Sequence, residues 1–241
     1  MKRFRKKVNR RVTPRPVPWR LILGFFLALG LAVGGGKGLR WLLDPHTFPI
    51  QKVRIQGTLH HVSREDVRER LAAFLPAGFF SLDMEGIRRA LEAHPWVRRA
   101  AVRRLWPHTL IVLLSEEVPL ARWQDGGLVN VQGQRFFPET SPRGLPVWKG
   151  PAGTETVLLG YHLAMEKAMQ PLGHGISAIA LDERGAVRFR LDNGLEVNLG
   201  RQAIMERLRR FVRVYPALRD TVAMERVDMR YSNGFAVKPK G

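Results

Sequence analysis

Apolar residues follow one another almost without a break from Leu21 to Val33, directly after a strongly basic N-terminal segment. Residues 1–20 contain nine Lys/Arg and no acidic residue. Basic flanks stay in the cytoplasm while an apolar segment enters the bilayer, so we predict a cytoplasmic leader over residues 1–20. A helix must cover about 30 Å of hydrocarbon at 1.5 Å per residue, and we therefore expect the transmembrane helix to span residues 21–43.

The length of this apolar core also fits a cleaved signal peptide, whose apolar region is about 7–15 residues long. The twenty-residue leader contains three prolines, and a small-x-small cleavage site is recognisable only around Ala32 to Gly34. These two features favour an uncleaved anchor. An uncleaved anchor in this orientation places the rest of the chain outside the cytoplasm.

Alternating and helical patterns predict a small domain over residues 48–117. Val53 and Ile55 alternate with cations, which indicates a strand. Ser63 and Asp66 have the spacing of a capping box at the start of a helix, and a second helix is expected to begin at Ser81. Strands are expected over residues 97–104 and 110–114, and the continuous apolar run of the latter is typical of a strand buried on both faces. The β-α-α-β-β order predicts two helices covering a three-stranded mixed sheet.

Shorter strands, Gly-containing turns and two helical stretches fill residues 118–238, with 239–241 as a tail. Helices are predicted over 154–169 and 202–215, the second ending at Pro216. Strands are predicted over 120–123, 128–131, 135–137, 176–181, 187–191 and 195–199, followed by a last strand from Val227 that continues through residues 232–234 to Val237. The expected fold class is therefore α+β: one transmembrane helix, the small domain, and a mixed β-sheet domain with two helices and a C-terminal edge strand.

The net charge of the 241-residue chain is +19, a value often associated with nucleic-acid binding. The leader supplies nearly half of this charge as a topology signal, and the predicted location is away from nucleic acid, so we expect no nucleic-acid partner. Most remaining cations, including those of residues 201–213, are interpreted as solvated faces. Cysteine is absent, which excludes disulfides and thiolate metal sites.

Motifs for catalysis are missing from the sequence. The seven histidines do not form H-x-x-x-H or H-E-x-x-H spacing, and there is no G-x-S-x-G elbow. The adjacent carboxylates of Glu116 and Glu117 point to opposite faces of a strand and cannot act as a pair. We therefore predict a non-enzymatic protein with no catalytic residue, metal, cofactor or small-molecule substrate.

Several short motifs together resemble those of the FtsQ/DivIB family of bacterial cell-division proteins, and the resemblance covers nearly the whole chain. They are Phe48-Pro49-Ile50 with Val53-x-Ile55-x-Gly57, His94-Pro95-Trp96-Val97, Arg104-x-Trp106-Pro107, Glu117-x-Pro119-x-Ala121-x-Trp123, Asn198-Leu199-Gly200-Arg201 and Val227-Asp228-x-Arg230-Tyr231-x-x-Gly234. The small domain resembles a POTRA domain, which is a docking module.

The resemblance implies an essential septal scaffold: a single-pass type II inner-membrane protein, located at the division septum, with its bulk in the periplasm. It implies recruitment of divisome proteins through the POTRA domain, pairing of the C-terminal strand with the FtsB/FtsL complex, and a contribution to septal wall assembly. The partner-binding residues that it implies are Arg184, Arg230, Tyr231, Ser232, Gly234, Phe235 and Val237. The chain ends four residues after Val237, so a longer tail function is not carried over.

A terminal strand with an unpaired edge is a site at which another chain can add a strand. Tyr231 and Phe235 are aromatic residues of the kind that anchor such contacts. Tyr231 fits an inward-facing core position equally well, whereas Phe235 favours the partner. Two alternatives remain. The first is a POTRA-bearing component of protein export or outer-membrane assembly, which is disfavoured because this sequence lacks the strand pattern of a barrel. The second is a membrane-tethered cell-wall enzyme, which is disfavoured because the motifs for catalysis are missing.

Overall fold

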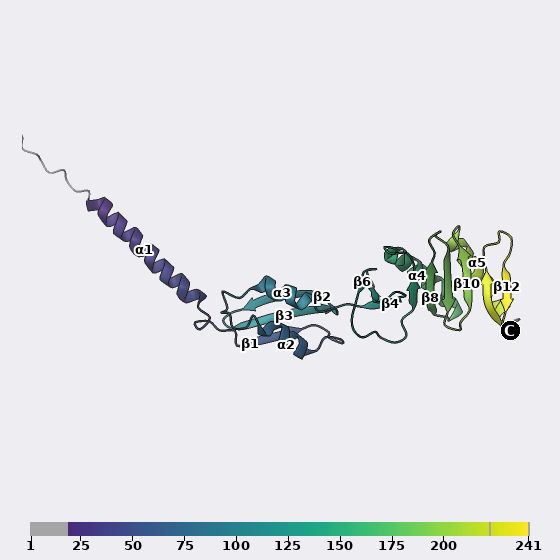
Figure 1. Cartoon of the computed structure of the whole chain (residues 1–241), viewed down its shortest axis with the longest axis horizontal. Coiled ribbons are helices and arrows are strands. Elements are labelled where there is room, and N and C mark those ends of the chain that lie inside the picture. The colour runs from purple at the N-terminus through teal and green to yellow at the C-terminus, as the bar shows by residue number, and fades with distance from the viewer. Residues whose placement is uncertain (1–18, 222, 241) are drawn as a thin grey trace, which may run out of the picture.

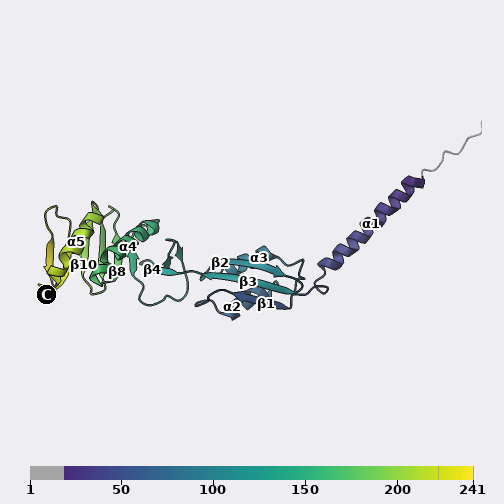
Figure 2. The same cartoon turned by 180° about the vertical axis from the view of Figure 1, so that it is seen from behind.

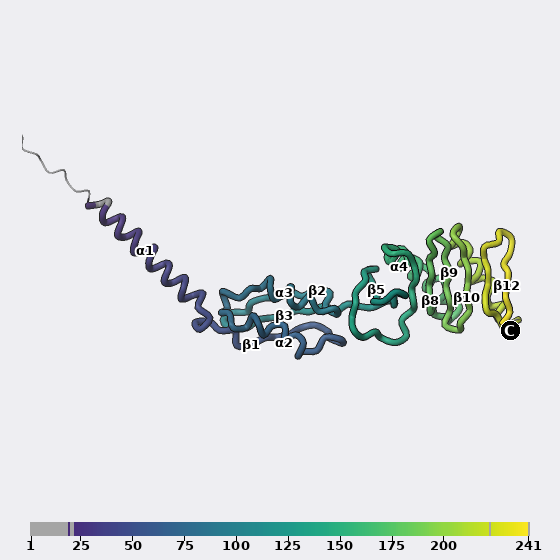
Figure 3. Tube along the Cα trace, viewed as in Figure 1, coloured from purple at the N-terminus to yellow at the C-terminus, as the bar shows by residue number. Residues whose placement is uncertain are grey.

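The computed structural model describes residues 19–221 and 223–240, which form one long helix and two folded domains arranged in a row (Figure 1). The same order is seen from behind in Figure 2. In the trace of Figure 3 the chain leaves the first domain at the end of β3 and enters the second close by. The predicted leader lies almost entirely outside the described residues, so it stays a prediction.

Helix α1 (Trp19–Leu43) begins the described chain and stands apart from the domains. Its stretch Ile22–Leu43 is the one helix among the described residues that is long and apolar enough to cross a membrane. The apolar side chains of this stretch are not buried in the protein, as expected of a surface that faces lipid, and only its last turn contacts the first domain.

Ring contacts join the end of α1 to the first domain. The ring of Trp41 lies 5.6 Å from that of Phe48, which lies 5.5 Å from that of Phe80. The backbone N–H of Phe79 donates to the carbonyl of Phe48 at 2.7 Å. The base of the first domain therefore rests on the last turn of α1.

The first domain comprises β1 (Lys52–Gln56), α2 (Arg64–Ala72), α3 (Met84–Glu92), β2 (Val97–Leu105) and β3 (Thr109–Glu116). The sheet order is β1-β3-β2, with β1 parallel and β2 antiparallel to β3. Ser63 and Asp66 form the expected capping box of α2. Apolar residues of both helices share one core with the facing side of the sheet.

Two details of this domain differ from the sequence-based expectation. Helix α3 begins at Met84 with Asp83 as its N-cap, while the hydroxyl of Ser81 instead accepts the N–H of Gly78. Strand β3 is buried on one face only: Val112 is fully buried, whereas Ile111 is half-buried on the other face. Both helices lie on one side of the sheet, and the opposite face remains open.

The second domain is built on a nine-stranded sheet of order β12-β11-β10-β9-β8-β7-β4-β5-β6. Its strands are β4 (Pro119–Trp123), β5 (Leu128–Asn130), β6 (Arg135–Phe136), β7 (Val147–Lys149), β8 (Ile176–Leu181), β9 (Val187–Leu191), β10 (Glu196–Gly200), β11 (Met224–Asp228) and β12 (Ala236–Pro239). Helices α4 (Glu155–Met169) and α5 (Ile204–Arg219) share a core with one face of the sheet, and a short 3-10 helix (Gln170–Leu172) follows α4. The α+β fold class with a C-terminal edge strand is therefore confirmed.

Helix α5 does not end at Pro216, as we expected, but continues to Arg219. A proline removes one backbone donor from a helix and clashes with the preceding turn. Here only three helical residues follow it, and the preceding turn is held by the buried rings of Phe211 and Tyr215. The packing of that turn outweighs the local preference of proline.

The predicted last strand is in fact a pair of strands. β11 ends at Asp228 and runs parallel to β10, and β12 returns antiparallel to β11 with Val227 opposite Val237. Residues 229–235 form the connection between them, which we call the β11–β12 loop. The sequence pattern was misread as continuous because apolar residues recur at even spacing on both sides of the loop.

Candidate protein-interaction surface

The outer edge of β12 and the β11–β12 loop together form the surface to which the sequence points. β12 is the last strand in the sheet order, and no strand of the described chain pairs with its outer edge. Five predicted site residues lie in the loop, namely Arg230, Tyr231, Ser232, Gly234 and Phe235, and Val237 lies in β12 itself. The structure therefore brings these six residues together.

The backbone of β12 offers donors and acceptors on its outer side. The N–H of Lys240 donates inward to the carbonyl of Ala223 at 2.9 Å. Polar groups alternate in direction along an antiparallel strand, so Lys238 also faces inward and Val237 directs its N–H and carbonyl outward. Pro239 has no N–H to donate, and it therefore limits how far a partner strand can be paired.

The two aromatic residues of the loop have different environments. Tyr231 exposes 58% of its surface, and it lines a shallow hollow with residues 232–236. Phe235 is half-buried and packs against the core of the second domain. Tyr231 is thus the aromatic ring that is open to a partner, and Phe235 in part supports the loop from beneath.

Arginines on α5 hold the loop in place. Arg210 donates to the carbonyls of Met229, Tyr231 and Ser232 at 2.7–2.9 Å. Arg207 donates to the carbonyls of Leu199 and Arg230 at 2.7 and 3.1 Å. The planar fork of arginine allows one side chain to bind several carbonyl groups.

We expected most of the cations in residues 201–213 to lie on solvated faces, and Arg207 and Arg210 are exceptions, because they bind loop carbonyls. They lie three residues apart on α5 and therefore share one face of the helix. The sequence shows this spacing. It does not show the position of the loop that the two arginines bind, because the β11–β12 hairpin was predicted as one continuous strand.

Asp228 and Arg230 fix the start of the loop. A carboxylate oxygen of Asp228 accepts the N–H of Arg230 at 3.0 Å, and the two side chains form an ion pair at 2.7 Å. Burial favours a higher pKa for Asp228, but the hydrogen bonds and charge of Arg230 outweigh it and hold the pKa below its ordinary value of 3.8. Asp228 therefore remains charged and keeps the Arg230 side chain in one position.

Arg184 lies at the same end of the sheet as the loop, in the turn between β8 and β9. The strand pairing shows this, because the residues at this end of neighbouring strands are paired: Leu181 with Val187, Val187 with Gly200, and Asn198 with Asp228. The side chain of Arg184 is exposed, and the turn is held by hydrogen bonds to Asp182. An acidic group placed at this end of the sheet faces cations from both segments.

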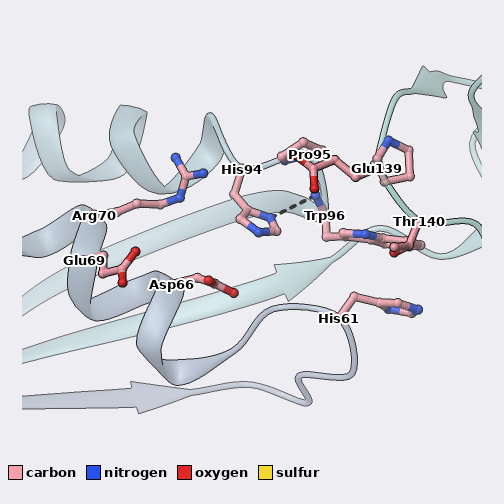
Figure 4. A pocket seen from close by; sticks show the side chains of 10 residues that line it. His61, Asp66, Glu69, Arg70, His94, Pro95, Trp96, Glu139 and Thr140 are labelled. Atoms are coloured by element: carbon pink, nitrogen blue, oxygen red, sulfur yellow. Dashed lines mark hydrogen bonds between the residues drawn. The ribbon is translucent and has the colours of Figure 1, made fainter.

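A separate hollow lies at the junction of the two domains (Figure 4). The rings of His61 and Trp96 stack with centroids 3.7 Å apart, and Trp96 meets Phe136 of the second domain at 5.3 Å. Phe136 and Leu128 belong to the second domain in sequence but pack into the core of the first. This contact joins the two domains through a shared apolar cluster.

The carboxylate of Glu116 organises the loop that supplies His61. It accepts the backbone N–H groups of His60, His61 and Val62 at 2.8–3.2 Å. Burial of Glu116 favours a raised pKa, but these three amide donors outweigh it and keep the pKa below 4.5. Glu116 is therefore a structural anion, and the adjacent Glu117 instead accepts a hydrogen bond from Asn130 at 2.8 Å.

One of the polar groups that line the junction hollow is the ring of His94. Burial, followed by the charge of Arg70, lowers the pKa of His94, so its ring is neutral and accepts the N–H of Trp96. Across the described residues, no three His, Asp or Glu side chains are grouped as metal ligands. The interactions of this hollow stabilise the junction.

Together these features define a class of protein: one apolar N-terminal helix, a small β-α-α-β-β domain, and a larger sheet with an open edge. A family model described as "POTRA domain, FtsQ-type" matches residues 48–117, and one described as "Cell division protein FtsQ/DivIB, C-terminal" matches residues 121–230. Both matches fall on the folded body beyond α1.

Relatives named "Cell division protein FtsQ" align along most of the chain. The protein from Hahella chejuensis is 36% identical over 228 residues, which cover 92% of this chain and 76% of that protein. The protein from Allochromatium vinosum is 36% identical over 221 residues, covering 91% and 88%, and that from Shewanella oneidensis is 36% identical over 239 residues, covering 96% and 91%. The chain belongs to the FtsQ family of cell-division proteins.

Proposed function

We propose that this chain is a non-enzymatic scaffold of the division septum that binds its partners outside the cytoplasm. Its basic leader remains in the cytoplasm, α1 crosses the inner membrane, and both domains lie in the periplasm. The positive charge of residues 1–20 and the apolar surface of α1 support this orientation. The FtsQ relatives support the role in division.

The unpaired outer edge of β12, beside a preformed loop, is the observation that carries the proposal. A strand added there gains main-chain hydrogen bonds from Val237, while the exposed ring of Tyr231 offers a side-chain anchor. Arg230 in the β11–β12 loop and Arg184 in the β8–β9 turn add cationic groups at one end of the sheet, although Arg184 lies several strands away from the β12 edge. We therefore expect the partner to supply a β-strand with an acidic residue beside it.

The resemblance to the FtsQ/DivIB family assigns this edge to the FtsB/FtsL complex and the recruitment of other divisome proteins to the POTRA domain. It also implies that the protein contributes to septal wall assembly. The domain limits proposed on this basis are 48–117 for the POTRA domain and 118–238 for the second domain.

A proline substitution in β12 tests the strand pairing. Val237→Pro removes the outward N–H, so capture of periplasmic FtsB/FtsL segments by the full chain in detergent is expected to be lost. Val237→Ala keeps the N–H while shortening the side chain, and it is the matched control. Circular dichroism reports whether each variant folds. Full capture by folded Val237→Pro would rule out pairing at this edge.

Orientation and role are tested in cells. A reporter active only in the periplasm, fused to the C-terminus, is expected to be active in the natural chain and weakened when the nine leader cations are replaced by Gln. Depletion of the protein is expected to give filaments without septa. Loss of outer-membrane proteins with normal septation would instead favour the export alternative.

A further inference from the structure

The turn between β2 and β3 carries exposed apolar residues that the fold does not explain. Trp106 exposes 68% of its surface and Leu105 exposes 43%. Neither of the two cores formed by the described residues includes Trp106 or Leu105. Single exposed apolar residues are common, but here two neighbours form one apolar tip.

This tip lies at the end of the first domain that faces α1. The carbonyl of His108 accepts the N–H groups of Gln51 and Lys52, at 3.0 and 3.3 Å, so the turn rests on the first residue of β1. β3 begins at this end and leads away from α1 toward the second domain (Figure 1). The tip therefore lies at the same end of the first domain as the last turn of α1.

The connection from α1 to the first domain is short and well packed. Eight residues separate Leu43 from Lys52, and Phe48 among them contacts both Trp41 and Phe80. Pro49 forms a β-bridge with Gly78, and a side chain added at Gly78 would meet Pro45 at 2.9 Å. The first domain is thus held against the end of α1 and does not hang on a loose linker.

Two cations lie near the apolar tip on the open face of the sheet. Lys52 lies opposite Thr109, and Arg103 lies opposite Ile111, so both project from the open face of the sheet together with Leu105. Arg104 points to the other face, where it donates to the carbonyl of Leu82 at 2.7 Å. A tryptophan with cations beside it has the chemistry of a membrane–water interface, where the ring lies among headgroups and the cations bind lipid phosphates.

We propose that Leu105 and Trp106 form a second membrane contact, which rests on the outer headgroup layer of the same bilayer that α1 crosses. Lys52 and Arg103 bind anionic phospholipid at this contact. The inference rests on the proposed function for the insertion of α1. Because α1 already tethers the domain at high effective concentration, a small contact is sufficient to fix its tilt.

Fluorine NMR of the full chain in lipid nanodiscs tests this contact directly. The chain has six tryptophans, and 5-fluorotryptophan gives each a signal that single Trp→Phe variants assign. Nanodiscs of phosphatidylethanolamine and phosphatidylglycerol carry a nitroxide on some headgroups. We expect the nitroxide to reduce the Trp106 signal as strongly as that of Trp41, while the signal of Trp148, buried in the second domain, keeps its intensity.

Comparing the signals of Trp41 and Trp106 distinguishes the insertion of α1 from the proposed membrane contact of Trp106. If Trp41 and Trp106 both keep their intensity, α1 is not inserted, and the proposed function and the contact both fail. If Trp41 is attenuated and Trp106 is not, the anchor stands and the contact is wrong. The latter result is also expected if another protein, and not lipid, covers Trp106, since the nanodisc contains this chain alone.

The role of the cations is tested by charge removal. Lys52→Gln with Arg103→Gln, or nanodiscs without phosphatidylglycerol, is expected to restore much of the Trp106 signal while that of Trp41 stays attenuated. Arg209→Gln with Arg213→Gln, which removes two exposed cations of α5, is the matched control. Equal attenuation of Trp106 in all of these samples would overturn the assignment of anionic phospholipid.

Discussion

The exposed ring of Tyr231 belongs to a loop whose backbone carbonyls are held by Arg207 and Arg210, so the ring and its support have separate roles. We expect Tyr231→Ala to weaken binding of the FtsB/FtsL segments by about 2 kcal/mol, the threshold of a hot-spot residue. Tyr231→Phe, which keeps the ring, is expected to retain most of the affinity. Isothermal titration with each folded variant measures the difference, and equal affinities for all three proteins would exclude Tyr231 as an anchor.

Arg210 acts on the same surface from beneath. Arg210→Gln removes the donors to three loop carbonyls, so the loop must be ordered during binding, and we expect an affinity loss of about ten-fold. Arg210→Lys is expected to rescue little, because an ammonium group lacks the planar fork. Arg213→Gln, which removes an exposed cation about one turn further along the same helix, is the control. An unchanged affinity for folded Arg210→Gln would show that the loop needs no support.

At the scale of secondary structure, alternation proved reliable where strands have one buried face. β8 and β9 have the predicted limits, because Ile179 and Phe189 face the core while their neighbours face outward. Prediction failed where a tertiary contact overrides a local preference. α5 passes through Pro216 because the packing of Tyr215 fixes the turn before it.

The site was harder to predict than the elements. The residue types of the β11–β12 loop predict a partner-binding surface, but the shape of this loop depends on contacts distant in sequence. Arg210 and Tyr231 are 21 residues apart, and Glu116 lies 54 residues from Val62. Such pairs leave no periodic signal, so the sequence indicated which residues to examine without showing what holds them.

Glu116 links two elements, the end of β3 and the loop before α2, and its effect depends on pH. Its folded pKa is lowered, so its carboxylate stabilises the fold above its ordinary pKa of 4.5. Glu116→Gln places an amide against three N–H donors, and we expect a loss of about 1–3 kcal/mol at pH 7. The difference from the natural chain should shrink as the pH falls below about 4.5.

Denaturation of the full chain in detergent across this pH range measures the effect, and hydrogen exchange of residues 60–62 locates it. Glu65→Gln is the matched control, since the Glu65–Arg68 pair on α2 is exposed and contributes little. A Glu116→Gln difference that stayed constant down to pH 3 would show that the stabilisation does not come from ionised Glu116.

At the scale of the whole molecule, the row formed by α1 and the two domains places the β12 edge at the end remote from the membrane (Figure 1). The separation of the β12 edge from the membrane is well defined only if the two domains keep a fixed orientation relative to each other. That relation rests on Leu128 and Phe136, which the second domain contributes to the core of the first, and on the hydrogen bond between Asn130 and Glu117. A rigid junction lets one anchored chain present its edge at a defined height.

Phe136 and Phe137 allow this rigidity to be tested with neighbouring residues. Phe136 is buried beside Trp96, whereas Phe137 exposes 62% of its surface. Phe136→Ala is expected to lower the stability of the junction by about 3 kcal/mol. It is also expected to broaden the distribution of distances between spin labels attached to introduced cysteines on the two domains, which electron paramagnetic resonance measures. Phe137→Ala should leave those distances narrow. If Phe136→Ala also left them unchanged, the domains would be held by the backbone connection and not by the shared core, and the height of the edge would not depend on this cluster.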